Sequence, residues 1–234
     1  MPKNEKIFDL IIAHRGLHTN EIPENTIGAI NNAVLNNVAL EIDVQLTKDN
    51  VLVVFHDKNL LRLTNVNKNL KDVTYNEIKN LFIKNSKETI PRFEDVLKIV
   101  DGKVLLDIEI KYYSKPLKTI KCLGKLLEKY EGKYIIKSFN PFISFLYKLF
   151  NKTANVGVLA KKNKIINVLN YLFLYKPDFI AYNIDDINDN IVKKIKKYNI
   201  PLYLYTINSS EKLDKAKKWT KTIIYENLDK KRLE

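Results

Sequence analysis

The chain has 234 residues and a formal net charge of +13, from 40 Lys and Arg against 27 Asp and Glu residues. Its length suits one large domain or two small ones, and a hydrophobic content of 45% is ordinary for a protein with a packed core. The single cysteine, Cys122, excludes an intrachain disulfide, and no apolar run reaches the roughly 18 residues of a membrane-spanning helix. The N-terminal segment does not look like a signal peptide, so we expect a cytoplasmic protein.

The positive charge is spread along the whole chain. A basic surface can attract nucleic acid, anionic lipid or phosphorylated substrates. Lysines occur throughout this sequence, however, and no basic stripe is interleaved with stacking aromatic residues. We therefore expect no nucleic-acid partner.

Short apolar runs rich in β-branched residues alternate with segments of helical pattern. Near-continuous apolar strands that alternate with helices indicate a parallel sheet covered by helices, and eight of them predict an α/β fold of the (β/α)8 TIM barrel type. The predicted barrel strands cover residues 8–14, 38–46, 103–111, 133–139, 155–160, 178–184, 201–207 and 222–227.

A ninth apolar run, "VLVVFHD" at 51–57, follows the second barrel strand after only the four residues "TKDN". A parallel partner needs a crossover of a dozen or more residues, so this run must return antiparallel as a hairpin. We therefore predict that residues 45–91 form a small inserted subdomain after strand 2. Residues 1–234 would form one barrel domain around it.

Titratable residues lie on or at the ends of the first three barrel strands and at the end of the hairpin, and a TIM barrel carries its active site at the C-terminal ends of its strands. Two of them, Glu41 and Asp43, are two residues apart and so share one face of their strand. Buried in a core without partners, such groups would be very costly, whereas at a wet barrel mouth they cost much less. The predicted cluster consists of His14, Arg15, Glu41, Asp43, His56, Glu109 and Lys111.

The residue types of this cluster point to phosphate chemistry. Three carboxylates from adjacent strands form an oxygen cage suited to one divalent cation, Mg²⁺ or Ca²⁺, and the Cys and His residues are too few for a zinc site. A cation, an arginine and a lysine would neutralise the oxygens of a phosphate ester. One histidine would take a proton from the nucleophile and the other would give one to the leaving oxygen.

The motifs "AHRG", "PENT", "LEIDVQLTKDN", "VLVVFHD", "IPRFEDVL" and "LLDIEIK" occur in an order that resembles the glycerophosphodiester phosphodiesterase family. The resemblance continues through "SFNP" and "YLYTIN" and so covers nearly the whole chain. It implies metal-dependent hydrolysis of glycerophosphodiesters to sn-glycerol 3-phosphate and an alcohol. Carried over by position, the resemblance implies His14 and His56 as catalytic residues, Glu41, Asp43 and Glu109 as metal ligands, and Arg15 and Lys111 as phosphate contacts.

The chain departs from the family pattern at two places. Tyr205 stands where the family commonly has the Trp of Trp-Thr-x-Asn, and we expect it to stack on glycerol or on a headgroup. The final strand has Tyr225-Glu226-Asn227-Leu228 where the family usually has Thr-Asp-x-Pro. These departures leave the preferred substrate open.

Some residues near the cluster have simpler interpretations. Asn25 or Thr26 would cap the first helix, with Glu24 facing the positive end of its dipole. His18 would be a solvated loop residue.

Two other functions also remain open. One is a lysophospholipase D-type lipid phosphodiesterase, with attack by water or by a substrate hydroxyl that gives a cyclic phosphate. The other is a non-catalytic glycerophosphate binder.

Two predicted helices, 141–150 and 163–176, are apolar around more of their circumference than an ordinary barrel helix. We expect them to form an exposed patch rimmed by lysines, with Phe145, Tyr147, Leu172 or Phe173 exposed. Such a patch suits a homodimer or peripheral contact with an anionic membrane.

Overall fold

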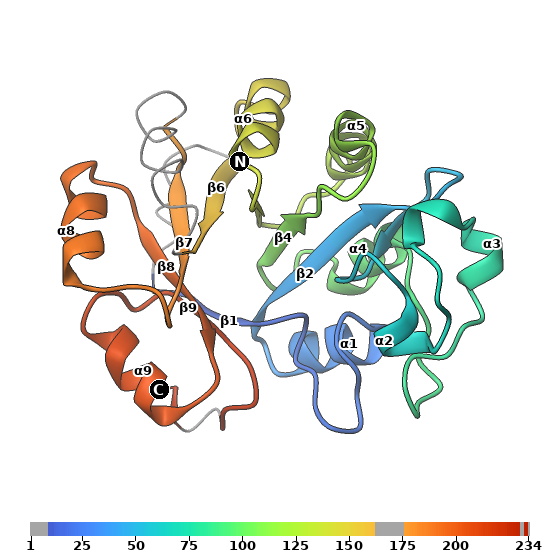
Figure 1. Cartoon of the computed structure of the whole chain (residues 1–234), viewed down its shortest axis with the longest axis horizontal. Helices are drawn as coiled ribbons and strands as arrows, with labels where there is room; N and C mark the ends of the chain where they lie inside the picture. The colour runs from blue at the N-terminus through green and yellow to red at the C-terminus, as the bar shows by residue number, and fades with distance from the viewer. Residues whose placement is uncertain (1–8, 162–175, 230–231, 234) are drawn as a thin grey trace.

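The computed structural model describes residues 9–161, 176–229 and 232–233. Within these residues, parallel strands close into a barrel in the order β1-β2-β4-β5-β6-β7-β8-β9, and β9 pairs again with β1 (Figure 1). The predicted (β/α)8 TIM barrel is therefore confirmed. Its strands are β1 (Ile11–Ala13), β2 (Ala39–Leu46), β4 (Leu106–Ile110), β5 (Tyr134–Ser138), β6 (Asn155–Ala160), β7 (Phe179–Asn183), β8 (Leu202–Ile207) and β9 (Ile223–Tyr225).

Burial on both faces explains why these strands read as apolar runs. Alternate side chains point into the barrel or out toward the helices, and both sets are shielded from water. In β2, seven of the eight residues are buried. The register places Glu41 opposite Asp107 and Asp43 opposite Glu109, so the carboxylates of β2 and β4 share the same levels of the barrel.

Helices surround the barrel, and several begin at side-chain caps. Thr26, Asn188 and Ser209 each accept a hydrogen bond from the first turn of a helix, which satisfies a backbone donor that has no helical partner. The larger described helices are α1 (Ile27–Leu35), α4 (Phe93–Val100), α5 (Pro116–Leu127), α6 (Pro141–Phe150), α8 (Asp189–Lys197) and α9 (Ser210–Lys217).

The segment after β2 leaves the barrel. Strand β3 (Leu52–Val54) pairs antiparallel with β2, as the short connection predicted. It is followed by three short helical turns, α2 (Leu61–Thr64), η1 (Leu70–Asp72) and α3 (Tyr75–Ile78). Buried residues of this segment form a small apolar cluster of their own around Phe55 and Leu70. The excursion therefore has a core that can hold its loops in fixed positions beside the barrel mouth.

The surface prediction for α6 is partly wrong. Tyr147 is buried, with 1% of its surface exposed, and Phe145 is only partly exposed, because α6 packs against α5, β5 and β6. The exposed apolar residues of this helix are Phe142, Leu149 and Phe150. Leu172, Phe173 and most of the predicted helix 163–176 lie outside the described residues. Within the described part of the chain, none of the helices combines the length and the apolar character that crossing a membrane would require.

Candidate active site

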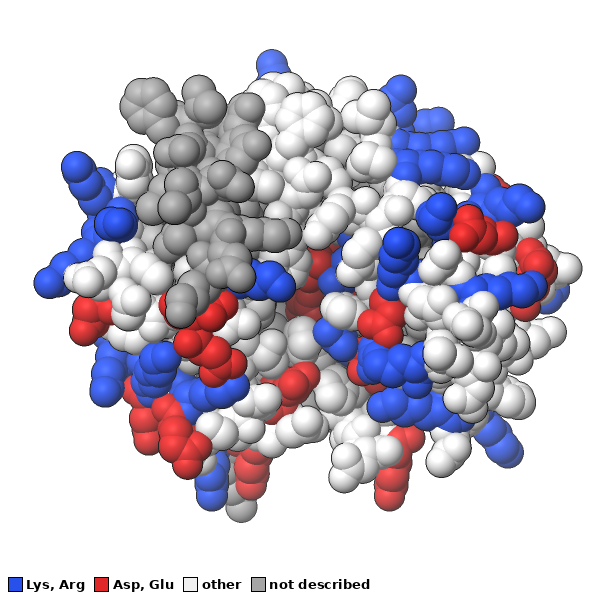
Figure 2. All heavy atoms as spheres, in the orientation of Figure 1, with Lys and Arg blue, Asp and Glu red and all other residues white. Residues whose placement is uncertain are grey.

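Three buried carboxylates meet at the end of β2 and β4. Glu41, Asp43 and Glu109 each offer an oxygen atom, and these oxygens lie within 4.8 Å of one another. The face of the molecule shown in Figure 2 has acidic and basic side chains side by side around a hollow near its middle. The predicted acidic cluster is therefore present as one compact group.

The loop after β1 holds two of these carboxylates in place. The backbone N–H of Arg15 donates to Glu41 Oε2 at 3.0 Å. Asn25 Nδ2 donates to Asp43 Oδ2 at 2.8 Å, and Asn25 Oδ1 accepts from the N–H of Asp43 at 3.2 Å. Asn25 is fully buried and has a φ of 58°, a left-handed conformation that asparagine tolerates better than most residues. Asn25 is thus a support of the acidic cluster, and Thr26 alone caps α1.

Lys111 lies within the acidic cluster. Its ammonium is 2.7 Å from Asp43 Oδ1 and 2.5 Å from Glu109 Oε1, and its side chain is 3% exposed. Burial disfavours the charged ammonium, but the charges of Asp43 and Glu109 outweigh this and raise the pKa of Lys111. Lys111 therefore stays cationic at the edge of the carboxylate group.

The donor set fits a hard divalent cation. All three ligand candidates are carboxylates, which suit Mg²⁺ or Ca²⁺. Among the described residues, Asp43 Oδ1 is partnered by the Lys111 ammonium at 2.7 Å, which leaves a second lone pair of this oxygen for a cation. Burial, together with the charges of Asp43 and Glu41, outweighs Lys111 and raises the pKa of Glu109, so a further negative charge here is a surplus that burial disfavours. A bound cation would offset that surplus.

His14 is held by a residue from the other end of the chain. Its Nδ1 lies 2.7 Å from Glu226 Oε2, just after β9, and His18 Nε2 lies 3.7 Å from the same oxygen. The hydrogen bond from His14 and the proximity of His18 lower the pKa of Glu226 despite partial burial. When Nδ1 donates to this carboxylate, His14 Nε2 is left as the atom that can accept or give a proton.

His56 has a carboxylate partner next to it in the chain. His56 Nδ1 lies 2.6 Å from Asp57 Oδ1. The backbone on both sides is fixed by Gln45, whose Nε2 donates to the carbonyl oxygens of Phe55 at 2.7 Å and Asp57 at 2.8 Å. Both candidate catalytic histidines therefore have an Nδ1–carboxylate contact, although the two carboxylates come from different parts of the chain.

Arg15 occupies a tight turn at the end of β1. Its φ is 54°, and the φ of Gly16 is 78°, where a Cβ atom would lie only 2.9 Å from that of Ala29. This turn points the guanidinium across the loop, so that Nη1 is 2.6 Å from Glu24 Oε1 and Nε is 3.6 Å from Asp43 Oδ2. Glu24 is consequently an anchor for Arg15.

Glu24 also accepts hydrogen bonds from Arg62. Burial disfavours the Glu24 carboxylate, but the hydrogen bond from Arg62 and the charge of Arg15 outweigh it and lower the pKa of Glu24 to about 2. Glu24 is thus ionised at neutral pH, between two guanidinium groups.

Tyr205 lies on β8 and is 9% exposed. Its hydroxyl donates to the carbonyl oxygen of Ala160 at 2.9 Å, and its ring meets that of Phe139 edge to face at 6.0 Å. Most of the ring is covered by the protein, so only a small part faces the mouth.

A buried lysine near the acidic cluster is absent from the sequence prediction. Lys137 on β5 is 1% exposed, donates to Asp107, and lies 3.5 Å from Glu41 Oε1. The charges of Asp107 and Glu41 outweigh burial and raise the pKa of Lys137. The signal in the sequence is a single lysine inside the apolar run "KYIIKSF".

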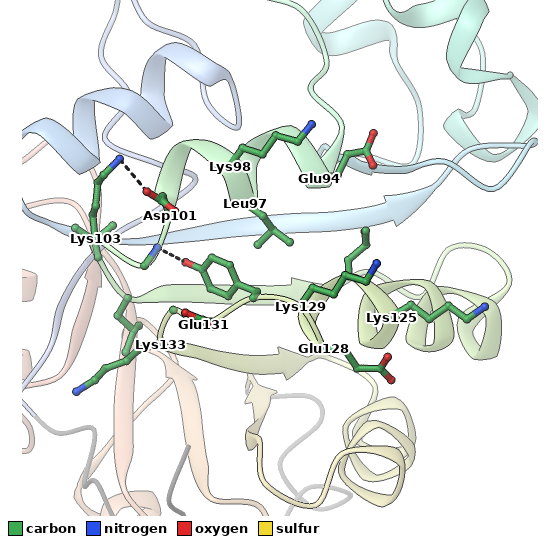
Figure 3. Close-up of a pocket in the computed structure, with 16 residues that line it drawn as sticks. Glu94, Leu97, Lys98, Asp101, Lys103, Lys125, Glu128, Lys129, Glu131 and Lys133 are labelled. Atoms are coloured by element: carbon green, nitrogen blue, oxygen red, sulfur yellow. Dashed lines mark hydrogen bonds and ion pairs between the residues drawn. The ribbon is translucent and has the colours of Figure 1, made fainter.

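A large cavity lies far from these groups. Its volume is about 1220 Å³, and it opens between the ends of α4 and α5 (Figure 3). The backbone segments 103–105 and 132–133 line it just before β4 and β5, at the end of the barrel opposite to the mouth. Residues of its wall also contact one another. Lys103 pairs with Asp101, and the N–H of Gly102 donates to the hydroxyl of Tyr130. None of the candidate catalytic residues reaches it.

A TIM barrel whose mouth combines three buried carboxylates with histidine and arginine side chains has the residue types that phosphate-ester hydrolysis requires. Residues 14–230 match the glycerophosphoryl diester phosphodiesterase family. The chain belongs to this family, which confirms the resemblance inferred from the motifs.

Individual relatives agree with this family assignment. The chain is 33% identical to a glycerophosphodiester phosphodiesterase of Caldanaerobacter subterraneus subsp. tengcongensis over 228 residues, which cover 88% of each chain. It is 27% identical to human lysophospholipase D GDPD1 over 184 residues, or 73% of this chain and 57% of that protein. A phosphodiesterase of Oleispira antarctica, solved with sn-glycerol-3-phosphate, has the same fold, with a TM-score of 0.85, 22% identity and 93% coverage of both chains.

Proposed function

We propose that this protein hydrolyses glycerophosphodiesters to sn-glycerol 3-phosphate and an alcohol with one bound divalent cation. The observation that carries this proposal is the group of three buried carboxylates flanked by two histidines, each with its own carboxylate partner. The activity named for the relative that is 33% identical supports the same substrate class.

The chain's own side chains bind and orient the phosphodiester. Glu41, Asp43 and Glu109 would hold Mg²⁺ or Ca²⁺, which supplies Lewis-acid stabilisation of the negative charge on the phosphate oxygens. Arg15 and Lys111 contribute fixed positive charge beside that position, and both lie next to Asp43. Their charge favours the transition state, in which negative charge on the phosphate oxygens is greatest.

The two histidines move the protons. One accepts a proton from the attacking water as its oxygen bonds to phosphorus, and the other gives a proton to the alcohol oxygen as the phosphorus–oxygen bond to it breaks. Glu226 and Asp57 keep the Nδ1 atoms of His14 and His56 engaged, so Nε2 is the reacting atom of each ring. We propose that residues 45–91 form the subdomain that carries His56.

We also propose a cytoplasmic location. The lone cysteine, Cys122, supports it, because proteins of reducing compartments rarely depend on disulfides.

Metal removal tests this proposal directly. Chelation of the purified protein should abolish release of sn-glycerol 3-phosphate from glycerophosphoethanolamine. Addition of Mg²⁺ or Ca²⁺ in excess of the chelator should restore this activity. Full activity after exhaustive chelation would contradict the cation site. A protein that binds glycerophosphate but turns over none of the diesters would support the non-catalytic alternative.

A lysophospholipase D-type activity is the second candidate function. Exposed apolar side chains follow β4 and β5 on the side of the barrel mouth: Tyr112, Leu117 and Phe142. They could contact an acyl chain or an anionic bilayer, and the relative named lysophospholipase D supports this possibility. Phosphorus NMR of the products from a lysolipid and from a soluble diester would separate the two activities and would reveal any cyclic phosphate.

Analytical ultracentrifugation would test dimerisation through α6.

A further inference from the structure

Arg62 makes contacts that no part of the proposed reaction uses. It lies on α2, in the excursion after β2. Its Nε and Nη2 donate to Asp57 at 2.5 and 3.2 Å, and its Nη1 and Nη2 donate to Glu24 at 3.0 and 2.7 Å. A single guanidinium thus joins two carboxylates.

Each of these carboxylates holds a group that the proposed mechanism needs. Asp57 contacts His56 at 2.6 Å, and Glu24 contacts Arg15 at 2.6 Å. The charged groups therefore form one continuous chain, in which a proton-transfer residue and a phosphate-binding residue are the two ends and Arg62 is the middle.

The geometry needs an arginine. A planar guanidinium has donors that can engage two carboxylates at once, whereas an ammonium is a point charge without this fork. Glu24 and Asp57 are 11% and 22% exposed, so their negative charges are only partly screened by water. Without the guanidinium between them, they would repel one another, and each would turn toward other partners.

We propose that Arg62 is a positioning residue that fixes His56 relative to Arg15, and so aligns the excursion with the barrel mouth. This inference rests on the proposed function for its kinetic consequences, although the chain of contacts does not depend on it. The Arg62 side chain is 44% exposed, and ion pairs that water can reach contribute little to stability. Its replacement should consequently affect alignment more than folding.

Kinetics of three variants provide the first test. Arg62→Ala should lower kcat about 30-fold and raise KM by less than about fivefold, and Arg62→Lys should recover part of the loss, because it restores the charge without the fork. Arg92→Ala is the matched control: Arg92 pairs with Glu94 and Asp95, its side chain is 39% exposed, and it is not part of the chain of contacts. Its kcat should stay within about twofold of wild type. Equal kcat values for the Arg62→Ala and Arg92→Ala variants would overturn the proposal.

A double-mutant cycle tests whether Arg62 acts through Glu24. If it does, Arg62→Ala combined with Glu24→Gln should lose little more kcat than Arg62→Ala alone, because both changes break the same chain. If the kcat losses of the two single variants multiply in the double variant, Arg62 acts independently of Glu24, and the proposal is overturned. A rise in KM without a fall in kcat for Arg62→Ala would overturn it as well.

A readout without turnover separates this inference from the proposed function. In ¹H–¹⁵N NMR spectra of the free protein, Arg62→Ala should shift the side-chain resonances of both Arg15 and His56, and Arg92→Ala should shift neither. Unchanged resonances would overturn the proposal. If the wild-type protein hydrolyses none of the diesters, the proposed function fails, but this spectroscopic comparison still decides the role of Arg62.

Discussion

The two halves of the barrel differ in what their inner side chains carry. In the first half, β2, β4 and β5 bring six ionisable side chains to neighbouring levels: Glu41, Asp43, Asp107, Glu109, Lys111 and Lys137. In the second half, β7 and β8 carry Phe179 and Tyr203, whose rings stack at 4.4 Å, beside Tyr205. Ionic pairing fills the first half, and aromatic packing fills the second.

The two halves should differ in how well they tolerate substitution. Loss of one partner from a buried ionic group leaves an uncompensated charge, which is strongly destabilising, whereas an aromatic ring can lose a hydroxyl at small cost. The three carboxylates of the candidate site therefore lie in the half of the barrel where substitution is most destabilising. Glu226 is the exception, since it follows β9 yet serves His14.

Of the changes proposed here, replacement of either candidate catalytic histidine should lower kcat the most. His14→Ala and His56→Ala should each lower kcat about 10³-fold, because each removes one proton transfer. His18→Ala is the comparison, since His18 lies 3.7 Å from Glu226 but has no proposed role in proton transfer. Its kcat should fall less than about fivefold. Near-normal turnover by both of the first two variants would sink the two-histidine mechanism.

The ionic half should also show a pH-dependent contribution to stability. The pKa of Glu24 is about 2 in the folded protein, below the ordinary 4.5, so its contribution is complete above pH 4.5 and is lost as pH falls through 2. Glu24→Gln should therefore lower the free energy of unfolding by about 3 kcal/mol at pH 7, and the difference should shrink toward pH 2.

Urea unfolding at several pH values measures this difference. Glu94→Gln is the control, because Glu94 pairs with Arg92 at a side-chain exposure of 42%. It should change the free energy of unfolding by less than about 0.5 kcal/mol at neutral pH. A Glu24→Gln difference that is equal at pH 7 and at pH 2.5 would contradict the shifted pKa.

Glu226 tests whether a residue from the second half can limit chemistry in the first. Glu226→Gln removes the negative charge that pairs with His14 but keeps a side chain of the same size, so kcat should fall about 10- to 30-fold. Steady-state kinetics would measure it, with Glu211→Gln on the exposed surface of α9 as the control. Equal kcat values for the two variants would exclude a role for Glu226 in orienting His14.

Tyr205 should give the smallest effect. Tyr205→Phe removes the hydrogen bond to Ala160 and keeps the ring, so kcat/KM should change less than about threefold. The same assay with glycerophosphodiesters of different headgroups checks it. A tenfold loss of kcat would break the contrast, since the aromatic half would then take part in the chemical step.

The sequence predicted the barrel because its strands are buried on both faces, which leaves apolar runs that a local pattern can detect. The hairpin was equally predictable, since four residues cannot span a parallel crossover. The acidic cluster and the histidines could be located because they interrupt such runs near their ends. All of these signals are local.

The residues that sequence reasoning missed depend on distant partners. Glu24 and Asn25 were accounted for by the start of α1, yet their side chains reach Arg62 and Asp43. Glu226 reads in the sequence only as a departure from a family motif, although it contacts His14, a residue 212 positions earlier. Tyr147 is one of four residues among which the apolar pattern predicts an exposed side chain, and it is buried because α5, β5 and β6 pack against α6, which a local pattern cannot reveal.

Pairing of His14 with Glu226 links activity to the order of protein synthesis. A growing chain acquires both candidate catalytic histidines, all three acidic ligands, Arg15 and Lys111 within its first 111 residues. The carboxylate that orients His14 is made last, and it reaches His14 only when β9 pairs with β1. A nascent chain or a fragment cut before β9 therefore carries nearly the whole reactive set without its final orientation. His14 therefore gains its carboxylate partner only when the ring of strands is complete.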